Sequence, residues 1–312
     1  MFAEDLLRDL RRAGFGPAAI ARYVRAISAR AAGRLPRHAE LVRSVAATAL
    51  VLFAVEFGAA LYLSATFGRD FGVSFLIGGS ALLLVACFWI LLHVGLMHGP
   101  REEAPLRRLP LPVALTMLRL VSIPAIVLLL EAERWNVAVW VFVASALTDV
   151  MDGVLARAFA MESSAGKVLD PLVDIAFNAT VYVTLARVGV LPWWVSGLLL
   201  GRYALLVFGT FALYIFSGPV RIEPTAFGKL TGVLTTSLVG LLLLGLASWN
   251  DVTRHQLKPV FDVGLGVLAI ATIIQVVFIG LANRKAHDAP EVELVRPPAQ
   301  GKVVGEIRGP RG

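Results

Sequence analysis

Four aspartates recur at helical spacing inside a very apolar stretch of the chain: Asp149, Asp152, Asp170 and Asp174. Ionisable side chains are costly inside a membrane segment, so their presence there indicates a functional site. Residues three or four positions apart lie on one face of a helix, so each pair presents two carboxylates about one turn apart. Oxygen ligands of this kind suit Mg²⁺, Mn²⁺ or Ca²⁺ and not zinc. The pattern predicts a divalent-metal site at the membrane surface, in an enzyme that acts on a phosphorylated lipid.

The two aspartate pairs are expected to meet at one membrane depth. The first pair ends an apolar span at 136–158 and the second begins a span at 169–189, so the two helices run antiparallel. Four clustered carboxylates repel one another strongly unless a cation neutralises them. Gly153 and Gly166 would let a large group approach the helix backbones, and Arg157 could donate charge-assisted hydrogen bonds to a phosphate. Helix caps or interface charges are the alternative, which one aspartate would fit and four would not.

The composition is that of an all-α, polytopic membrane protein. Hydrophobic residues make up 57% of the 312 residues, compared with about 45–50% in soluble domains. A membrane span needs roughly 20 apolar residues, and this length predicts about eight transmembrane helices. Their expected ranges are 45–65, 74–96, 112–130, 136–158, 169–189, 191–216, 230–248 and 260–282.

The net charge of +7 does not indicate a nucleic-acid partner, because the basic residues flank apolar spans. Membrane lipid with anionic headgroups, and the excess of Lys and Arg in cytoplasmic loops, explain the charge better. With eight spans, most loop arginines and lysines fall on the side that holds both termini and the aspartates. This distribution predicts an inner-membrane protein whose termini and active site face the cytoplasm. A single cysteine, Cys87, excludes an intramolecular disulfide and a cysteine metal site.

Five segments are expected along the chain. Residues 1–43 form a basic amphipathic leader that would lie on a membrane surface or, alternatively, pack on the protein as a solvated cap. Residues 44–97 form a transmembrane hairpin, and 98–110 a cytoplasmic linker. Residues 111–283 hold the catalytic core, and 284–312 form a tail whose composition predicts disorder.

The acidic segment resembles the signature of the CDP-alcohol phosphatidyltransferase family. Every defined position of D-x-x-D-G-x-x-A-R, eight residues, G-x-x-x-D-x-x-x-D is filled between Asp149 and Asp174. Pro112-Val-Ala-Leu-Thr116-Met-Leu-Arg119 resembles the opening of the family's first span, with Val113 in place of the usual asparagine. The resemblance covers about residues 106–285 and implies a six-helix core, which the hairpin precedes.

Members of this family transfer a phosphatidyl or related group from a CDP-linked donor, such as CDP-diacylglycerol, to an acceptor hydroxyl and release CMP. The resemblance implies that the four aspartates bind Mg²⁺ or Mn²⁺ and that Asp174 is also the general base, which must reach the acceptor oxygen. It implies that Asp149, Gly153, Arg157 and Gly166 hold the cytidine diphosphate. Family members commonly form dimers, which suggests a homodimer here.

The acceptor alcohol is left open by the sequence. The segment 221–231 resembles a loop of phosphatidylglycerophosphate synthases and eukaryotic-type cardiolipin synthases. Arg202, Arg221 and Lys229 could therefore form a pocket for an acceptor phosphate, and glycerol 3-phosphate is the favoured acceptor. Alternatively, Arg221 and Lys229 are ordinary residues of a cytoplasmic loop and Arg202 links helices.

Other acceptors and other functions are also open. Asp174 is followed by Ile175 and not by the lysine usual in those synthases, which is more like the serine- or inositol-transferring branches. Phosphatidylglycerol, inositol phosphate and serine are therefore alternative acceptors. A non-catalytic scaffold would be expected to have lost one of the acids. A channel or transporter would need its acids near the middle of the membrane, on a path open to both faces.

Overall fold

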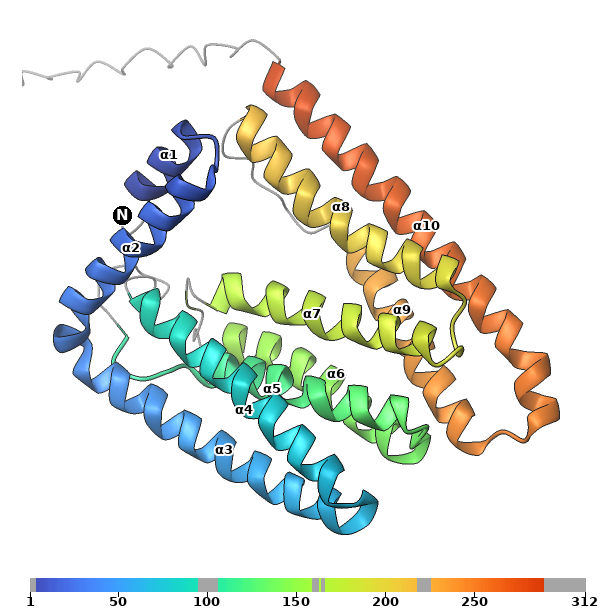
Figure 1. The fold of residues 1–312 in the computed structure, drawn as a ribbon. Coiled ribbons are helices and arrows are strands. Elements are labelled where there is room, and N and C mark those ends of the chain that lie inside the picture. Colours follow the sequence, from blue (N-terminus) through green and yellow to red (C-terminus); the bar gives the residue numbers. More distant parts are fainter. Residues whose placement is uncertain (1–3, 95–105, 159–162, 164–165, 218–225, 289–312) are drawn as a thin grey trace, which may run out of the picture.

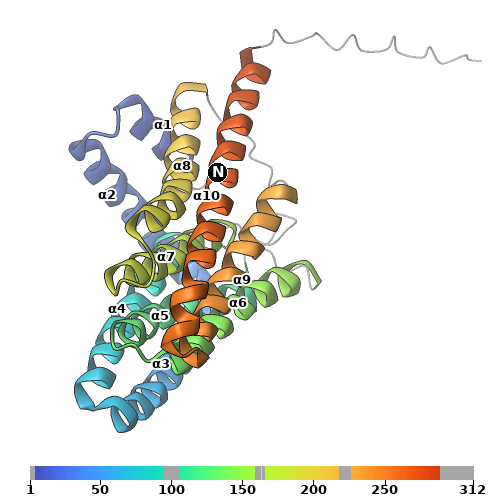
Figure 2. The same ribbon diagram turned by 90° about the vertical axis from the view of Figure 1, so that its right-hand side faces the viewer.

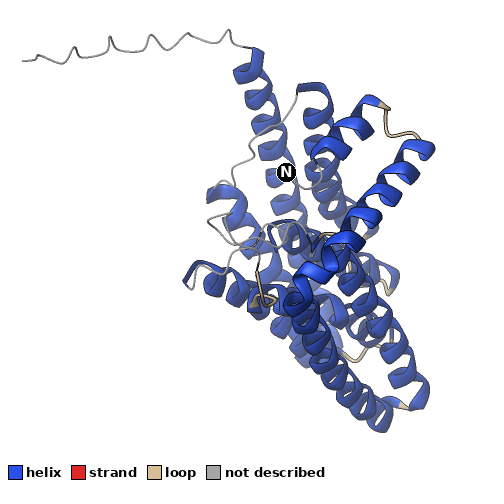
Figure 3. Ribbon diagram, turned by 90° about the vertical axis from the view of Figure 1, so that its left-hand side faces the viewer, coloured by secondary structure: helices blue, strands red, loops and turns tan. Residues whose placement is uncertain are grey.

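The computed structural model describes residues 4–94, 106–158, 163, 166–217 and 226–288 (Figure 1). Within these ranges every regular element is a helix (Figure 3). The elements are α1 (Glu4–Arg12), α2 (Pro17–Arg34), the 3-10 helix η1 (Leu35–His38), α3 (Ala39–Phe67), α4 (Arg69–Leu92), α5 (Leu111–Glu131), α6 (Trp135–Ala158), α7 (Gly166–Arg187), α8 (Trp193–Ser217), α9 (Ala226–Ser248) and α10 (Asp251–Asp288).

The helices from α3 to α10 coincide with the expected membrane spans. Seven helical stretches in the described residues are long and apolar enough to cross a membrane, and one of them continues from α2 through η1 into α3. The stretch Trp193–Gly209 of α8 is apolar but shorter. The prediction of an all-α, polytopic membrane protein is confirmed.

Short turns join α3 to α4, α5 to α6, α7 to α8 and α9 to α10, and the two helices of each pair pack together as a hairpin. α3 ends and α4 begins at Gly68, whose φ of +105° lies in the region that favours glycine. The α3/α4 hairpin packs along α5, which also contacts α6 and α7. α10 lies against α8 and α9 (Figure 2), and α9 contacts α6.

The main apolar core lies between α5, α6, α7, α8, α9 and α10 and also includes residues of α3 and α4. Buried side chains such as Leu129, Phe142, Val181, Leu243 and Leu265 form this cluster. The burial of apolar area at such contacts, together with close packing, holds the helices at fixed positions. This scaffold fixes the ends of α6 and α7, where the aspartates lie.

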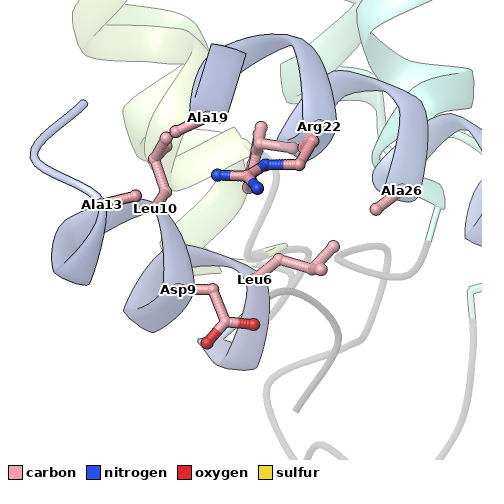
Figure 4. Close-up of a pocket in the computed structure, with 8 residues that line it drawn as sticks. Leu6, Asp9, Leu10, Ala13, Ala19, Arg22 and Ala26 are labelled. Atoms are coloured by element: carbon pink, nitrogen blue, oxygen red, sulfur yellow. The ribbon is translucent and has the colours of Figure 1, made fainter. Parts of the chain in front are cut away.

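The basic leader folds as α1 and α2, with Gly14 between them at a φ of +65°. Asp5 of α1 pairs with Arg30 of α2, and Ile27 of α2 packs on Leu92 at the end of α4. The two leader helices enclose a pocket of about 350 Å³ (Figure 4). The pocket is lined by Leu6, Asp9, Leu10, Ala13, Ala19, Arg22, Tyr23 and Ala26.

The expected linker and tail lie largely outside the described residues. Residues 95–105 and 289–312 are not described. Helix α10 continues to Asp288, which is beyond residue 284, where the sequence placed the start of the tail.

Candidate active site

The four signature aspartates lie where α6 ends and α7 begins. Asp149 interacts electrostatically with each of the other three, Asp152, Asp170 and Asp174. Asp152 is buried, whereas the Asp149 side chain is 50% exposed. The structure therefore brings together residues that are up to 25 positions apart in the sequence, in a cluster that is open at Asp149.

Arg119 of α5 lies between the two carboxylates of α6, although it was not predicted as a site residue from the sequence. Its Nη1 is 2.7 Å from Asp149 Oδ1, and its Nη2 donates to Asp152 Oδ2 at 2.8 Å. The Arg119 side chain is only 2% exposed. Because a guanidinium can pair with two carboxylates at once, this buried cation neutralises part of the cluster.

A signal for Arg119 was present in the sequence. It is an arginine inside an apolar span, and Pro112, Thr116 and Arg119 follow one another at helical spacing. In the sequence alone this pattern indicates a family resemblance and assigns no chemical role to these side chains. The structure shows that Thr116 and Arg119 both point from α5 to the aspartates.

The two aspartates of α7 each accept a hydrogen bond from a neutral side chain. Thr116 Oγ1 donates to Asp170 Oδ1 at 2.7 Å. Asn178 Nδ2, one turn further along α7, donates to Asp174 Oδ1 at 2.8 Å. These bonds fix the orientation of both carboxylates at the start of the helix.

The donor set has the chemistry that a hard divalent cation requires. Each of the four carboxylates uses one oxygen in the contacts above, and the described residues give the other oxygen no hydrogen-bond partner. Mg²⁺ and Mn²⁺ bind such oxygens. No three acidic, His or Cys side chains in the described part are placed to hold one ion. Arg119 is the cation that lies against Asp149 and Asp152.

The glycines of the signature lie beside the aspartates. Gly153 directly follows Asp152 on α6. A Cβ on Gly166 would lie 3.0 Å from Ser163 Oγ, and the Gly166 N–H donates to that oxygen at 2.9 Å. Glycine at 166 therefore allows a tight start to α7. The side chain of Arg157 lies outside the described residues, although its backbone belongs to α6.

The three basic residues expected to bind the acceptor differ in where they lie relative to the aspartates. Arg202 of α8 interacts electrostatically with Asp174, and its Nη2 would be 3.7 Å from a Cβ on Gly232 of α9. Lys229 is exposed in the first turns of α9. Arg221 lies outside the described residues. The structure therefore relates one of the three, Arg202, to the aspartates.

The fold and the site define a polytopic helical membrane protein with an acidic centre at one end of its bundle. A model of the family described as "CDP-alcohol phosphatidyltransferase" matches residues 109–280, which is more than half of the chain. The chain belongs to the CDP-alcohol phosphatidyltransferase family. The resemblance seen in the sequence is confirmed.

The curated relatives carry the names of two kinds of phospholipid synthase. A Mycobacterium tuberculosis protein provisionally named cardiolipin synthase is 39% identical over 126 residues, which cover 39% of this chain and 59% of the relative. Human cardiolipin synthase (CMP-forming) is 33% identical over 116 residues, or 36% of this chain and 38% of that protein.

A second Mycobacterium tuberculosis protein, provisionally named phosphatidylglycerophosphate synthase, is 29% identical over 170 residues, or 52% of this chain and 75% of that protein. The chain thus spans little more than half of the mycobacterial cardiolipin synthase relative. No solved structure matches the chain.

Proposed function

We propose that this protein transfers the phosphatidyl group of CDP-diacylglycerol to an acceptor alcohol and releases CMP, in a reaction that requires Mg²⁺ or Mn²⁺. The observation that carries the proposal is the meeting of the four signature aspartates at the facing ends of α6 and α7. Membership of a family that is generally dependent on divalent metals supports it.

The four aspartates would hold the metal through the carboxylate oxygens that have no described partner. The bound cation would neutralise charge on the diphosphate of the donor. Asp149, Gly153, Arg157 and Gly166 would bind the cytidine diphosphate, with the two glycines leaving room beside the helix backbones.

Asp174 would take the proton from the acceptor hydroxyl. Its Oδ1 accepts the hydrogen bond from Asn178, which fixes the orientation of the carboxylate that would act as the base. Arg119 is a positioning residue that fixes Asp149 and Asp152. The remaining catalytic effect would come from placing donor and acceptor in line.

Glycerol 3-phosphate is the acceptor that we propose, with Arg202, Arg221 and Lys229 as candidates to bind its phosphate. The interaction of Arg202 with Asp174 supports a cationic group close to the proposed base. Phosphatidylglycerol is the second candidate, because the 39% identical relative is named as a cardiolipin synthase. Both acceptors carry a phosphate, so both would use a cationic pocket.

A CMP-release assay tests the proposal. Purified protein in detergent would receive CDP-diacylglycerol, Mg²⁺ or Mn²⁺, and one acceptor at a time: glycerol 3-phosphate, phosphatidylglycerol, inositol phosphate, inositol or serine. We expect metal-dependent release with glycerol 3-phosphate. Release with a different acceptor alone would keep the transferase and change the acceptor, whereas no release with any acceptor would contradict the proposed donor.

The proposed arrangement in the membrane follows from the same helices. α3, α5 and α7 begin, and α4 and α6 end, at the end of the bundle where the leader lies (Figure 1). We infer that this end, with both termini and the active site, faces the cytoplasm of an inner membrane. A homodimer remains a prediction from the family resemblance.

A further inference from the structure

The α3/α4 hairpin lies outside the residues that match the family, yet it packs directly on the catalytic core. Helix α4 lies along α5 (Figure 1), and the hairpin shares one buried apolar cluster with α5 and α7. The hairpin contributes Leu41, Val45, Leu52, Leu83, Ala86 and Ile90, α5 contributes Val113, Met117 and Val121, and α7 contributes Leu169 and Val173. The hairpin is therefore continuous with the core that supports the aspartates of α7.

Two adjacent glycines allow α4 to approach α5 closely. A Cβ on Gly78 would lie 2.9 Å from Pro124 Cγ of α5. A Cβ on Gly79 would lie 3.3 Å from Val121 Cγ1 and would overlap the carboxyl of Glu56. Because helix interfaces are closely packed, any larger side chain at these positions must push the two helices apart.

Glu56 of α3 is a buried carboxyl at the same three-helix junction. Its side chain is 2% exposed, and Ser80 Oγ of α4 donates to its Oε1 at 3.2 Å. Within the described residues its Oε2 has no hydrogen-bond partner and no basic side chain forms an ion pair with it. A charge here would be costly, so Glu56 acts through its shape and its hydrogen bond to Ser80.

The hairpin and the aspartates contact different sides of α5. Val113, Met117 and Val121 face the apolar cluster that contains the hairpin. Thr116 and Arg119 hold Asp170, Asp149 and Asp152 through the contacts described above. A shift of α5 relative to the hairpin would therefore move Thr116 and Arg119 relative to the aspartates.

A second contact ties the hairpin to the start of α5. The Leu109 N–H, two residues before α5, donates to Ser44 Oγ of α3 at 3.0 Å. The hairpin thus holds the chain just before α5 begins and again near the middle of the helix, at Val121 and Pro124. Two separated attachments fix the direction of a helix as well as its position.

We propose that the α3/α4 hairpin is a positioning element of the active site, in which the Gly78–Gly79 surface and the Glu56–Ser80 contact set the placement of α5 and so of Arg119 and Thr116. The proposal rests on the proposed function, since it takes the aspartates as the metal site. A second-sphere change of this kind typically weakens metal binding by about 10- to 100-fold.

The test compares Gly78→Leu with Gly58→Leu in the full-length protein in detergent. Gly58 lies on α3 in the same hairpin, is exposed, and has no heavy atom within 4 Å of an added Cβ, so it is a matched control. Mn²⁺ binding is measured directly by electron paramagnetic resonance, without donor or acceptor. We expect about 10-fold weaker Mn²⁺ binding in Gly78→Leu and unchanged binding in Gly58→Leu.

The metal dependence of CMP release gives a second readout. If α5 is misplaced, Gly78→Leu should need about 10-fold more Mn²⁺ for half-maximal release and recover much of its activity at saturating Mn²⁺. A folded Gly78→Leu protein with wild-type Mn²⁺ binding would overturn the proposal. If that variant does not fold, Gly78→Ala replaces it, with a smaller shift expected, and unchanged binding there would overturn the proposal equally.

Two variants of Glu56 test the proposal independently of Gly78. Glu56→Gln keeps the shape and the acceptor for Ser80, so we expect wild-type Mn²⁺ binding. Glu56→Ala leaves a hole at the junction and should weaken Mn²⁺ binding in the same direction as Gly78→Leu. Equal loss in both Glu56 variants would show that the charge matters and would overturn the role assigned to Glu56.

Wild-type protein that binds no Mn²⁺ would contradict the proposed metal site, whereas equal binding in wild-type and all variants would contradict only the positioning role.

Discussion

The four signature aspartates are held by three neighbours of different kinds. Arg119 pairs with Asp149 and Asp152, Thr116 donates to Asp170, and Asn178 donates to Asp174. The acids could be predicted from the sequence because carboxylates are costly in apolar spans, so four of them at helical spacing indicate a site. Their partners could not be predicted, because which side chain faces which depends on how α5 packs against α6 and α7.

The Asp174→Asn variant tests the general base. The amide cannot accept the proton of the acceptor hydroxyl, so kcat should fall by about 10²- to 10⁴-fold. Three aspartates remain, so the protein should fold and keep part of its Mn²⁺ binding. The measurement is CMP release together with size-exclusion chromatography, with Asp251→Asn at the exposed start of α10 as the control. Retained turnover in Asp174→Asn would remove the base assignment.

Arg119→Gln tests the buried cation. Removing one partner of a buried ion pair costs about 3 to 5 kcal/mol, so the melting temperature without metal should fall clearly. Mg²⁺ or Mn²⁺ should restore more stability to this variant than to wild type, because a bound cation replaces the lost charge at Asp149 and Asp152. Thermal unfolding in detergent, with metal and with chelator, measures both effects. Equal melting temperatures in the absence of metal would contradict the role of Arg119.

At the scale of the helices, the sequence was most informative about length and order. The expected spans agree with α3 to α10, because apolar runs of membrane length are a strong local signal. The packing of the hairpin on α5 could not be predicted. It depends on the contacts of Gly78 with Pro124 and of Gly79 with Val121, which join parts of the chain that are more than 40 residues apart.

Arg202 of α8 interacts electrostatically with Asp174, the proposed base on α7, so α8 is expected to affect acceptor binding. In Arg202→Ala the KM for a phosphorylated acceptor should rise by about tenfold or more, as expected when a charged hydrogen bond is lost, and the KM for CDP-diacylglycerol should change less. Arg187→Ala, which breaks an exposed ion pair with Glu131 at the other end of α7, is the control. Equal effects on both substrates would favour an unphosphorylated acceptor.

At the scale of the whole molecule, the leader is a folded unit beside the end of the bundle that holds the aspartates. The hydrogen bond from Arg30 holds the pKa of the exposed Asp5 carboxyl well below its usual range. A lowered folded-state pKa means that this contact stabilises the α1–α2 pair above about pH 4, the ordinary Asp value, and is lost as the pH falls towards the folded-state value.

Hydrogen exchange tests this link between the leader helices. The amides of α1 should be protected at neutral pH in the wild type and should lose protection only in strong acid. Asp5→Asn should lower this protection modestly at pH 7, because the neutral amide cannot replace the exposed ion pair with Arg30. Asp70→Asn, an exposed aspartate in the first turn of α4, is the control. Unchanged protection of α1 in Asp5→Asn would show that the pocket contacts alone hold the leader.

The positive charge of Arg119 also affects how the helices can pack together while the protein is inserted into the membrane. A cluster of four bare carboxylates would resist closure of the bundle while the chain is being inserted into the membrane. With a guanidinium built in at 2.7 Å from Asp149 and 2.8 Å from Asp152, the helices can come together before any ion arrives. Assembly of the bundle would then not depend on a bound ion, and a metal at the proposed site would bind to a protein whose helices are already packed.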